Sequence, residues 1–579
     1  MKKIATTFLA MGLLLFTGIH AQSLQDGVND LYAERNKSAQ ATFEKLLAAN
    51  PNNIEATYWL GQTHLATDNI AAAREVYSKA LLASANAPLV IVGMGHVELS
   101  EKKVEEARQR FEAAITMSRG KKGDDPEILT AVGRAIVDVY NDKDKIGDIN
   151  YAVEKLEAAA ARDPKNADIF LNLGNAYRKA RPGEGGGKAF ESYKRANEVN
   201  PNFAAPSYRL AQLFNTQKNW DLFEQYLNEA ITKDPKFAPA YYDLYYLKLG
   251  KLDFAAAEDY AKKYIANSDP DVQNDYLRVQ TLWAKKSFDE AIAGAKDIIA
   301  KAGPQTKARV YKLIADSYVQ KKDTASAKQY IDEYFAKVKP EEVTALDYDL
   351  KATVYSAIPG QEDVVLASYQ EGVKADTVVD NKIDLIKRGI AFFNSRKQYD
   401  KEKQLQELLL QTKPNLTIND LFGAGIANYR AKDYPRSREI FTTVAEKYPE
   451  QEFGWEWKFN NAQLIDTVKK DSIALQDATA LLEFAQKDTA KFYKQIVNSS
   501  YFIAIYHNEK GDREKAVEYL KIMKDATKDP VKAASIQENI DLLSKPAPRQ
   551  QQSTPRSNAP KTGNSKATNA KTSTEKATG

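Results

Sequence analysis

The stretch WLGQTHLATDNIAAAREVYSKA, residues 59–80, contains the pattern that decides the fold. Its apolar side chains recur every three or four residues, which is typical of amphipathic helices. Short polar turns between such segments predict helical hairpins. Gly61 in the first segment and Ala73 in the second are small enough to let two helices pack closely against each other. Tyr77 is large enough to fill the space between neighbouring hairpins.

Prolines divide the chain at nearly regular intervals. Nine of them, from Pro51 to Pro340, follow one another at steps of 34 to 38 residues, and Pro414 and Pro449 continue the series. Self-similarity at such a period indicates one supersecondary unit that is stacked many times. Proline ends a helix because it lacks a backbone N–H and disfavours the helical conformation of the residue before it. We therefore expect a solenoid of helical hairpins.

The same order of small and large residues returns in later units. Examples are Gly95 with Ala107, Phe111 and Ala114, and Leu173-Gly174 with Ala189, Tyr193, Ala196 and Pro201. In these residues the repeat resembles the tetratricopeptide family. The resemblance implies an all-α, right-handed superhelical solenoid of stacked helix-turn-helix repeats. It is weaker at residues 340–414, where Glu402 replaces a small residue, and at residues 453–488, so distorted units are expected there.

The first residues have the three parts of a secretory signal peptide. Lys2 and Lys3 precede an apolar stretch that runs to Ile19, and a small-residue cleavage site lies before Gln22. Residues 1–21 are therefore predicted to be removed on export. An uncleaved membrane anchor is the alternative, but the apolar stretch is short for a span of about 20 residues.

The other end of the chain has a different composition. Residues 544–579 contain no aromatic or large aliphatic side chain and have an excess of lysine and arginine, so they predict a disordered basic tail. This tail is either a solvated extension or a weak electrostatic contact with an anionic surface. Between the two ends we expect an N-terminal repeat array, residues 22–340, and a more degenerate C-terminal array, residues 341–543.

Composition excludes several classes of protein. The chain has 579 residues, no cysteine and a net charge of +4. Without cysteine, the fold has neither disulfides nor thiolate metal sites, and its core alone must hold it together. The positive charge lies in the two ends, which leaves the body slightly acidic. A nucleic-acid-binding protein would carry its basic patch on the folded part, so the sequence does not favour that class.

The sequence contains no recognisable catalytic set. It has neither an HExxH nor a GxSxG motif, and its four histidines are far apart in sequence. Its carboxylates lie in helical charge patterns that are typical of solvated faces. We therefore predict no catalytic, cofactor-binding or metal-ligating residue and no cofactor.

The family resemblance implies a concave groove that is lined by the inner face of the first helix of each repeat. The family's clamp for an acidic peptide terminus would need a lysine where Leu171 stands and a basic residue where Tyr208 stands, so we expect an uncharged, aromatic groove. Amides hold extended peptides and tyrosines suit partner surfaces, although the tyrosines could also only fill gaps between units. The residues expected to line the groove and bind a partner are Tyr58, Gln62, Arg134, Asn172, Asn175, Lys179, Tyr208, Gln212, Tyr242, Tyr246, Phe422 and Tyr429.

These observations lead to a functional hypothesis. We expect a non-enzymatic scaffold in the periplasm, associated or not with the outer membrane, that binds protein partners of an envelope assembly, secretion or transport complex. Its partners would be envelope proteins or peptides and not nucleic acid, and the mature chain would have no transmembrane span. Peripheral docking on an outer-membrane complex is compatible with this hypothesis. Two alternatives are a periplasmic chaperone for outer-membrane protein clients and an enzyme that acts on cell-wall glycan.

Overall fold

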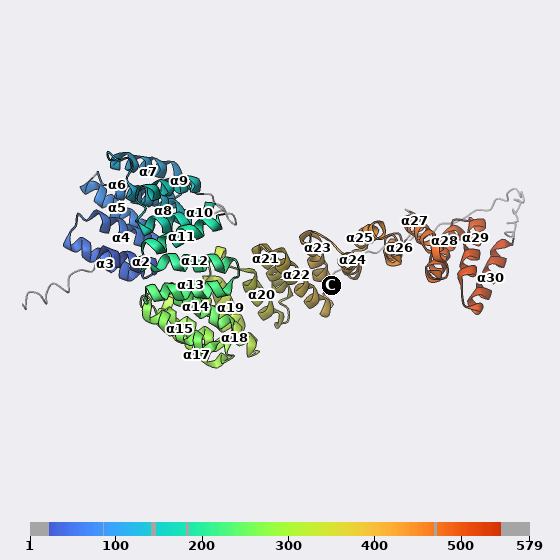
Figure 1. Ribbon diagram of the computed structural model, residues 1–579. Coiled ribbons are helices and arrows are strands. Elements are labelled where there is room, and N and C mark those ends of the chain that lie inside the picture. The colour runs from blue at the N-terminus through green and yellow to red at the C-terminus, as the bar shows by residue number, and fades with distance from the viewer. Residues whose placement is uncertain (1–22, 85, 141–145, 181–184, 468–471, 546–579) are drawn as a thin grey trace, which may run out of the picture. The chain divides into compact units, whose positions relative to one another are not determined.

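The computed structural model describes residues 23–84, 86–140, 146–180, 185–467 and 472–545 (Figure 1). Within these residues the backbone forms α-helices and short 3-10 turns, and no β-strand. The predicted all-α repeat solenoid is therefore confirmed. The predicted signal peptide lies outside the described residues, and so does the basic tail apart from Ser544 and Lys545.

The chain divides into two compact units. The first contains the described residues up to Val343 together with Leu350–Glu362, and the second contains Thr344–Asp349 and the residues from Asp363 onward. The boundaries of the two predicted repeat arrays stay predictions.

In the first unit, each helix packs against the helices before and after it in the chain, so the helices form a stack of antiparallel pairs. The helices of this unit are α2 (Leu24–Tyr32), α3 (Asn36–Ala49), α4 (Ile54–Ala66), α5 (Ile70–Ala83), α6 (Pro88–Ser100), α7 (Val104–Ser118), α8 (Pro126–Val139), α9 (Ile149–Arg162), α10 (Ala167–Ala180), α11 (Gly186–Val199), α12 (Ala204–Thr216), α13 (Trp220–Lys233), α14 (Ala238–Gly250), α15 (Phe254–Asn267), α16 (Tyr276–Ala284), α17 (Phe288–Ala302), α18 (Ala308–Gln320) and α19 (Thr324–Lys337), with the 3-10 turns η1 (Val272–Asp275), η2 (Gly303–Gln305) and η3 (Pro340–Glu342).

The second unit continues the same pattern from α22 to α30, where consecutive helices again pack together. Helix α20 (Ala345–Ser356) is divided between the two units. The following helices are α21 (Glu362–Ala375), α22 (Val379–Ser395), α23 (Tyr399–Thr412), α24 (Ile418–Arg430), α25 (Tyr434–Lys447), α26 (Glu452–Ile465), α27 (Ile473–Ala485), α28 (Tyr493–Glu509), α29 (Arg513–Ala526) and α30 (Pro530–Ser544), with the 3-10 turn η4 (Gln486–Asp488).

The turn inside each hairpin is built in the same way. After α4, Asp68 adopts a left-handed backbone conformation with φ of 56°. The N–H of Asn69 then bonds to the carbonyl of His64 at 2.9 Å, which ends the helix. The Asn69 side chain accepts the N–H of Ala72 and so starts α5. Because Lys102, Lys218 and Lys322 repeat the positive φ, one local geometry recurs along the chain.

The small residue of the first helix faces the large residue of the second. A Cβ on Gly61 would lie 2.1 Å from the Tyr77 ring, and one on Gly174 would lie 2.4 Å from the Tyr193 ring. The sequence pattern had suggested that Gly61 lies against Ala73. An added Cβ on Gly61 would first meet the aromatic ring one helical turn after Ala73, so the glycine also makes room for Tyr77.

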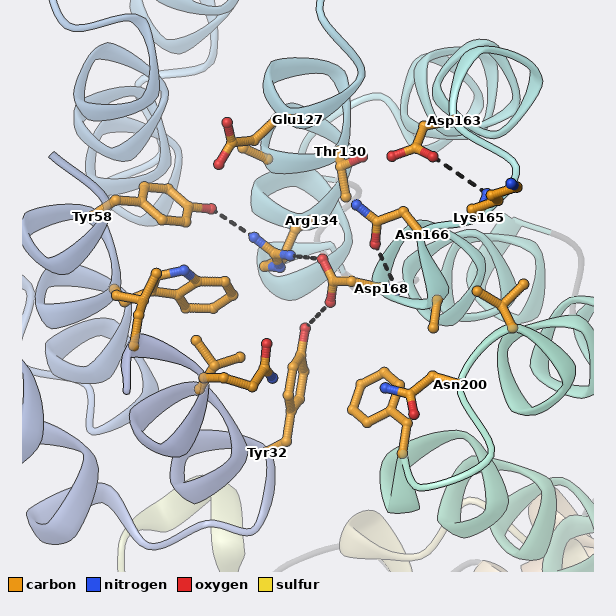
Figure 2. A pocket seen from close by; sticks show the side chains of 18 of the residues that line it. Tyr32, Tyr58, Glu127, Thr130, Arg134, Asp163, Lys165, Asn166, Asp168 and Asn200 are labelled. Carbon is orange, nitrogen blue, oxygen red and sulfur yellow. Dashed lines mark hydrogen bonds and ion pairs between the residues drawn. The ribbon is translucent and has the colours of Figure 1, made fainter. Parts of the chain in front are cut away.

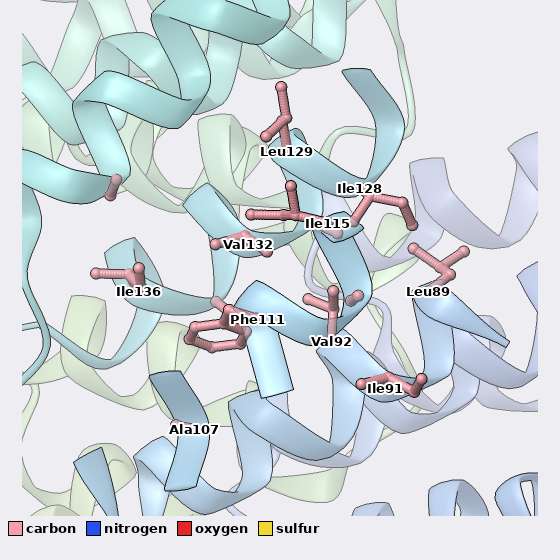
Figure 3. Close-up of a cluster of buried hydrophobic side chains, with 14 of the residues drawn as sticks. Leu89, Ile91, Val92, Ala107, Phe111, Ile115, Ile128, Leu129, Val132 and Ile136 are labelled. Carbon is pink, nitrogen blue, oxygen red and sulfur yellow. The ribbon is translucent and has the colours of Figure 1, made fainter. Parts of the chain in front are cut away.

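The core runs continuously from one hairpin into the next. Figure 3 shows Val92 on α6, Phe111 on α7 and Val132 on α8, whose side chains are buried and belong to a single apolar cluster. Every residue of α6 from Leu89 to Leu99 is buried, so this helix is covered on all sides by its neighbours.

The hairpins that depart most from the repeat pattern nevertheless form. In the α22–α23 hairpin, Glu402 replaces the small residue and is only 3% exposed. Its carboxylate accepts the Asn394 amide N–H at 2.8 Å, which compensates part of the cost of burying it. Trp455 of α26 stacks on Phe484 of α27 with ring centroids 6.0 Å apart.

Membrane insertion is not indicated by the helices that the structure describes. None of them combines the length and the apolar character that a helix needs to cross a bilayer.

Candidate functional site

The twelve residues predicted to line a groove lie on the first helices of their hairpins. Ten belong to the first unit, on α4, α8, α10, α12 and α14, and two belong to α24 of the second unit. Their assignment to a partner-binding groove stays a prediction. Their surroundings in the structure divide them into three groups. The first group lies on α4, α8 and α10, the second on α12 and α14, and the third on α24.

In the first group, Tyr58 and Arg134 take part in a hydrogen-bonded bridge across the inside of the first unit. Figure 2 shows that Arg134 donates to the Tyr58 hydroxyl and to Asp168, and that Tyr32 of α2 donates to the same carboxylate from the other side. The distance from Arg134 Nη1 to the Tyr58 oxygen is 3.0 Å. Asn172 completes the set, because its amide donates to Asp168 Oδ1 at 3.2 Å.

Burial and charge determine the protonation of this bridge. Arg134 is 7% exposed, and burial opposes its charge, but the Asp168 carboxylate and the Tyr58 hydroxyl hold its pKa above the ordinary value for arginine. The pKa of the Tyr32 hydroxyl is raised by burial and by the nearby Asp168 charge. At neutral pH, therefore, Arg134 is cationic and Tyr32 remains a hydrogen-bond donor. The guanidinium also lies over the Trp59 ring, 4.6 Å from its centroid.

The bridge lies between two cavities. One, of about 700 Å³, is lined by residues at the start of α2, α6, α8 and α10, among them Gln25, Leu89 and Glu127. The other, of about 500 Å³, is lined by residues near the ends of α4, α6 and α8, among them Ala66, Ser100 and Asp138. Both cavities share Tyr32, Trp59 and Arg134 in their walls. These three side chains thus form a partition inside the unit.

Contacts from the first hairpin to residues far along the chain close this interior. Asp269 accepts hydrogen bonds from Lys37 N at 2.6 Å and from the Ser38 hydroxyl at 2.7 Å. Arg35 donates to the carbonyl oxygen of Lys236, and Tyr32 packs edge-on against Phe203 with centroids 5.4 Å apart. Because these contacts surround the bridge, Tyr58 and Arg134 face the inside of a closed turn of the stack.

Gln62 belongs to a second buried chain of hydrogen bonds. Its amide donates to the Tyr77 hydroxyl at 2.9 Å, and that hydroxyl donates to the Tyr58 carbonyl at 2.8 Å. The amide oxygen of Gln62 must then accept from His96 Nδ1, 3.1 Å away, which fixes the histidine tautomer. Burial lowers the His96 pKa, which favours the neutral ring.

Asn175 and Lys179 have structural partners on neighbouring helices. Asn175 accepts the Tyr193 hydroxyl at 2.9 Å. Lys179 donates to the carbonyl oxygens of Val137 at 2.6 Å and Tyr140 at 3.0 Å, where α8 ends. A lysine in this position satisfies carbonyls that the end of a helix leaves without a partner.

The second group, on α12 and α14, is half-buried and adjoins a further pocket. Tyr208 and Gln212 both donate to Asp243. Tyr242 and Tyr246 lie edge to face with centroids 4.8 Å apart. A pocket of about 400 Å³ lies beside them, and its walls include Asn215, Trp220, Phe223, Asp243, Tyr246 and Lys251.

Asp243 gives this surface a titratable group. Burial raises its pKa from 3.8 to about 6, against the opposing effect of the hydrogen bonds from Tyr208 and Gln212, while Glu34 raises it further. The structure thus differs from the uncharged groove that the sequence suggested, since the carboxylates of Asp168 and Asp243 both lie among the predicted residues.

The third group, Phe422 and Tyr429 of α24, packs within the second unit. Phe422 meets Phe453 edge to face at 5.2 Å, and Tyr429 meets Trp457 at 4.9 Å. Both residues are only partly buried. They connect neighbouring hairpins of the second unit.

Sequence reasoning missed Tyr32, Asp168, Asp243 and Asp269. Asp168 could have been found, because it precedes Asn172 by one helical turn and so lies on the same face. Asp243 follows Tyr242 directly, but nothing in the local pattern indicates its burial. Among the described residues, no group of three or more histidine, aspartate and glutamate side chains is arranged to hold a metal ion.

Comparison with known families supports the tetratricopeptide resemblance. Residues 30–91 match the family model described as a tetratricopeptide repeat. This segment spans the end of α2 and the helices α3 to α5 and reaches the start of α6, so it contains the WLGQTHLA stretch.

Three solved structures illustrate what this chain is similar to. The C-terminal part of a TPR repeat-containing protein from Cytophaga hutchinsonii is 22% identical, with a TM-score of 0.26, over 45% of this chain and 98% of that one. A tetratricopeptide repeat protein from Parabacteroides merdae is 19% identical, with a TM-score of 0.38, over 45% of this chain and 97% of that one. Yeast Tom70 is 13% identical, with a TM-score of 0.36, over 74% of this chain and 98% of that one.

Proposed function

We propose that this protein is an exported, non-enzymatic scaffold that binds protein partners of an envelope assembly, secretion or transport complex. A solenoid of tetratricopeptide-like repeats is an architecture suited to protein–protein interaction, because stacked hairpins present an extended surface. The proposed export to the periplasm, with or without association with the outer membrane, is supported by the signal-peptide pattern of residues 1–21.

One observation carries the binding proposal. The surface of α12 and α14 presents the half-buried Tyr208, Tyr242 and Tyr246 beside a pocket of about 400 Å³. Trp220, in the wall of that pocket, is 45% exposed. Tryptophan and tyrosine are the side-chain types that often dominate the binding energy at protein interfaces.

The residues on α4, α8 and α10 have a different character. Tyr58, Gln62, Arg134 and Asn172 are buried and hydrogen-bonded to other side chains of the same unit. Binding a partner there would first require those bonds to break. We therefore place the partner-binding surface on α12 and α14.

Site-specific crosslinking in the native host would test the proposal. A photoreactive amino acid in place of Asn215, which lines the pocket, should crosslink to one or a few envelope proteins. The same amino acid in place of Leu82, which is 90% exposed on α5, provides a control that should not capture those proteins. Trp220→Ala should reduce the Asn215 crosslinks without loss of helicity, because the indole is partly solvent-exposed.

Fractionation of the same cells would test export. The mature chain should appear in the periplasmic or outer-membrane fraction and begin near Gln22. A chain that is recovered from the cytoplasm with residues 1–21 intact, or as a lone monomer with no envelope protein crosslinked, would contradict the proposal.

A further inference from the structure

The last three helices that the structure describes, α28, α29 and α30, form a groove that none of the predicted residues lines. A cavity of about 750 Å³ lies between them, which is within the range of about 300–1,000 Å³ typical of ligand pockets. Leu520 and Ile536 form its buried floor, and Val497 and Met523 are partly exposed beside them. We refer to this surface as the C-terminal groove.

An aromatic side chain on the wall of the groove remains open to solvent. Tyr501 of α28 lines the cavity and is 52% exposed. Most other tyrosines of the chain are half-buried or buried by neighbouring hairpins. A tyrosine that is exposed beside an apolar floor provides apolar area and a polar tip, a combination favoured at interfaces.

The rim of the C-terminal groove is basic. Lys494, Lys528 and Lys532 line the cavity, and each is exposed. None of the three forms an ion pair with a residue that the structure describes. Lys528 lies over the Tyr493 ring, 3.8 Å from its centroid, and so brings its charge to the mouth of the groove.

Asp529, the acidic residue that lines the cavity, has hydrogen-bond partners within its own helix start. The carboxylate of Asp529 accepts the N–H of Val531 at 2.9 Å and of Lys532 at 3.4 Å, which caps the start of α30. As one carboxylate among three lysines, it offsets only part of their charge. The groove combines an apolar floor with a net positive rim.

The chain's own tail is a poor occupant for this groove. Residues 546–579 contain six lysines and arginines and one glutamate. Like charges at the rim would oppose their binding, and the tail has no large apolar side chain to cover Leu520 or Ile536. The groove calls for an occupant of the opposite charge that carries apolar side chains.

We propose that the C-terminal groove binds a short acidic segment of a partner protein, with apolar side chains on the floor and carboxylates at the three lysines. This inference rests on the proposed scaffold function, since it assumes that the ligand is a protein. It adds a second contact point, at the opposite end of the chain from the first unit, and gives its chemistry. Charge complementarity at the rim would speed association and select acidic sequences.

Fluorescence anisotropy with the full chain would test this inference. The probe is a labelled synthetic peptide in which leucine and phenylalanine alternate with glutamate and aspartate, and the matched peptide has lysine at every acidic position. The acidic peptide should bind and the basic one should not. Lys494→Glu/Lys532→Glu should weaken binding by about tenfold or more, which corresponds to about 1.4 kcal/mol, and Tyr501→Ala should also weaken it.

A control variant distinguishes the effect of the groove lysines on peptide binding from the effect of the chain's total charge. Lys262→Glu/Lys521→Glu changes two exposed lysines that do not line the groove, so it alters the total charge equally and should leave binding unchanged. All the substituted side chains are exposed, and circular dichroism should confirm that each variant remains helical.

Several outcomes would overturn the inference. Equal binding of the basic peptide, or equal weakening by the control variant, would show that no specific acidic site exists. Peptide binding only after removal of residues 546–579 would assign the groove to the tail. Lysine-dependent binding to vesicles of anionic phospholipid without peptide binding would assign it to a membrane surface. None of these results would affect the Asn215 crosslinks, which test the scaffold function separately.

Discussion

Asp269 caps the N-terminus of the helix that contains Ser38, although 231 residues separate the two in sequence. Its carboxylate accepts the Ser38 hydroxyl at 2.7 Å and the Ser38 N–H at 3.2 Å. Helix α3 has no side-chain cap of its own, because Arg35 stands at the capping position. A carboxylate at a helix N-terminus satisfies free N–H groups and interacts favourably with the helix dipole. The first hairpin is thereby attached to a segment that lies many repeats later.

Removing this cap should loosen the first hairpin. Asp269→Ala eliminates the hydrogen bonds to Lys37 and Ser38, and we expect a loss of about 1–2 kcal/mol in the free energy of unfolding. Urea denaturation would measure that loss. Amide hydrogen exchange should rise in α2 and α3, which lose their attachment to the later segment.

A local cap provides the matched control. Asp253 caps α15 within its own hairpin by accepting the Ala256 N–H at 3.1 Å. Asp253→Ala should cost a similar free energy, but exchange should rise in α15 and not in α2 or α3. If Asp269→Ala left exchange in the first hairpin unchanged, the long-range cap would have no mechanical role.

The Arg134 bridge leads to a second prediction. Arg134→Lys keeps the charge but loses the planar group that donates to Tyr58 and Asp168 together and lies over Trp59. We expect a loss of about 2–4 kcal/mol, because buried polar groups remain without partners. Tyr58→Phe alone should cost about 1 kcal/mol.

A double-mutant cycle would isolate the interaction between these two side chains. Once Arg134 is lysine, Tyr58→Phe should cost clearly less than it does in the wild-type chain, with a coupling of about 1 kcal/mol. Chemical denaturation of the four proteins would measure the coupling. Simple additivity of the two losses would mean that the hydrogen bond between Arg134 and Tyr58 does not contribute to stability.

The glycine of the hairpin contact supports a third prediction. Gly174→Leu places a side chain where the Tyr193 ring already lies 2.4 Å from an added Cβ, so the two helices must separate. The free energy of unfolding should fall by about 1–3 kcal/mol or more. Hydrogen exchange should rise most in this hairpin and in its neighbours, because most contacts of a repeat are with the repeats beside it.

Gly187 offers the contrasting case. An added Cβ there meets no atom within 4 Å, and the residue lies near the start of α11. Gly187→Ala should leave stability unchanged or raise it by up to about 1 kcal/mol, because alanine favours helix. A Gly174→Leu variant that melts at the wild-type temperature would contradict the packing described for Gly174 and Tyr193.

Local sequence pattern predicted the hairpins because the forces that form them are local. The small residue at Gly61, the large one at Tyr77 and the periodic prolines report contacts within a few helical turns. The local pattern did not show that Gly61 also faces the Tyr77 ring.

The hydrogen-bonded bridge at Arg134 and the cap formed by Asp269 depend on the rotations between all the hairpins that separate their members in sequence. Tyr32 reaches Asp168 across 136 residues, and Ser38 reaches Asp269 across 231. A small change in the rotation between neighbouring hairpins would move these groups apart. No local pattern encodes the combined rotation of many hairpins, so the sequence did not indicate that hydrogen bonds join Arg134 to Tyr58 and Asp168.

The last prediction concerns the pH dependence of stability. The pKa of Asp243 is about 6 in the folded chain, above its ordinary value of 3.8, mainly because it is buried. Between these two values the folded state holds a proton that the unfolded state has released. The contribution of Asp243 to stability therefore falls as pH rises from about 4 to about 6, and it is constant above about 7. The wild-type chain should gain about 1 kcal/mol from this carboxyl group between pH 7.5 and pH 5.

Comparison with Asp243→Asn isolates that contribution from other titrating groups such as His96. The difference in unfolding free energy between the wild type and the variant should shift by about 1 kcal/mol in favour of the wild type at pH 5. Asp420→Asn is the control, because hydrogen bonds from Lys413 and Thr417 outweigh burial and hold the Asp420 pKa below its ordinary value. Its contribution is lost only in more acidic solution, so the difference for Asp420→Asn should be the same at both pH values. A flat difference for Asp243→Asn would mean that its carboxyl group is solvated and that the α12–α14 surface is more open than the structure describes.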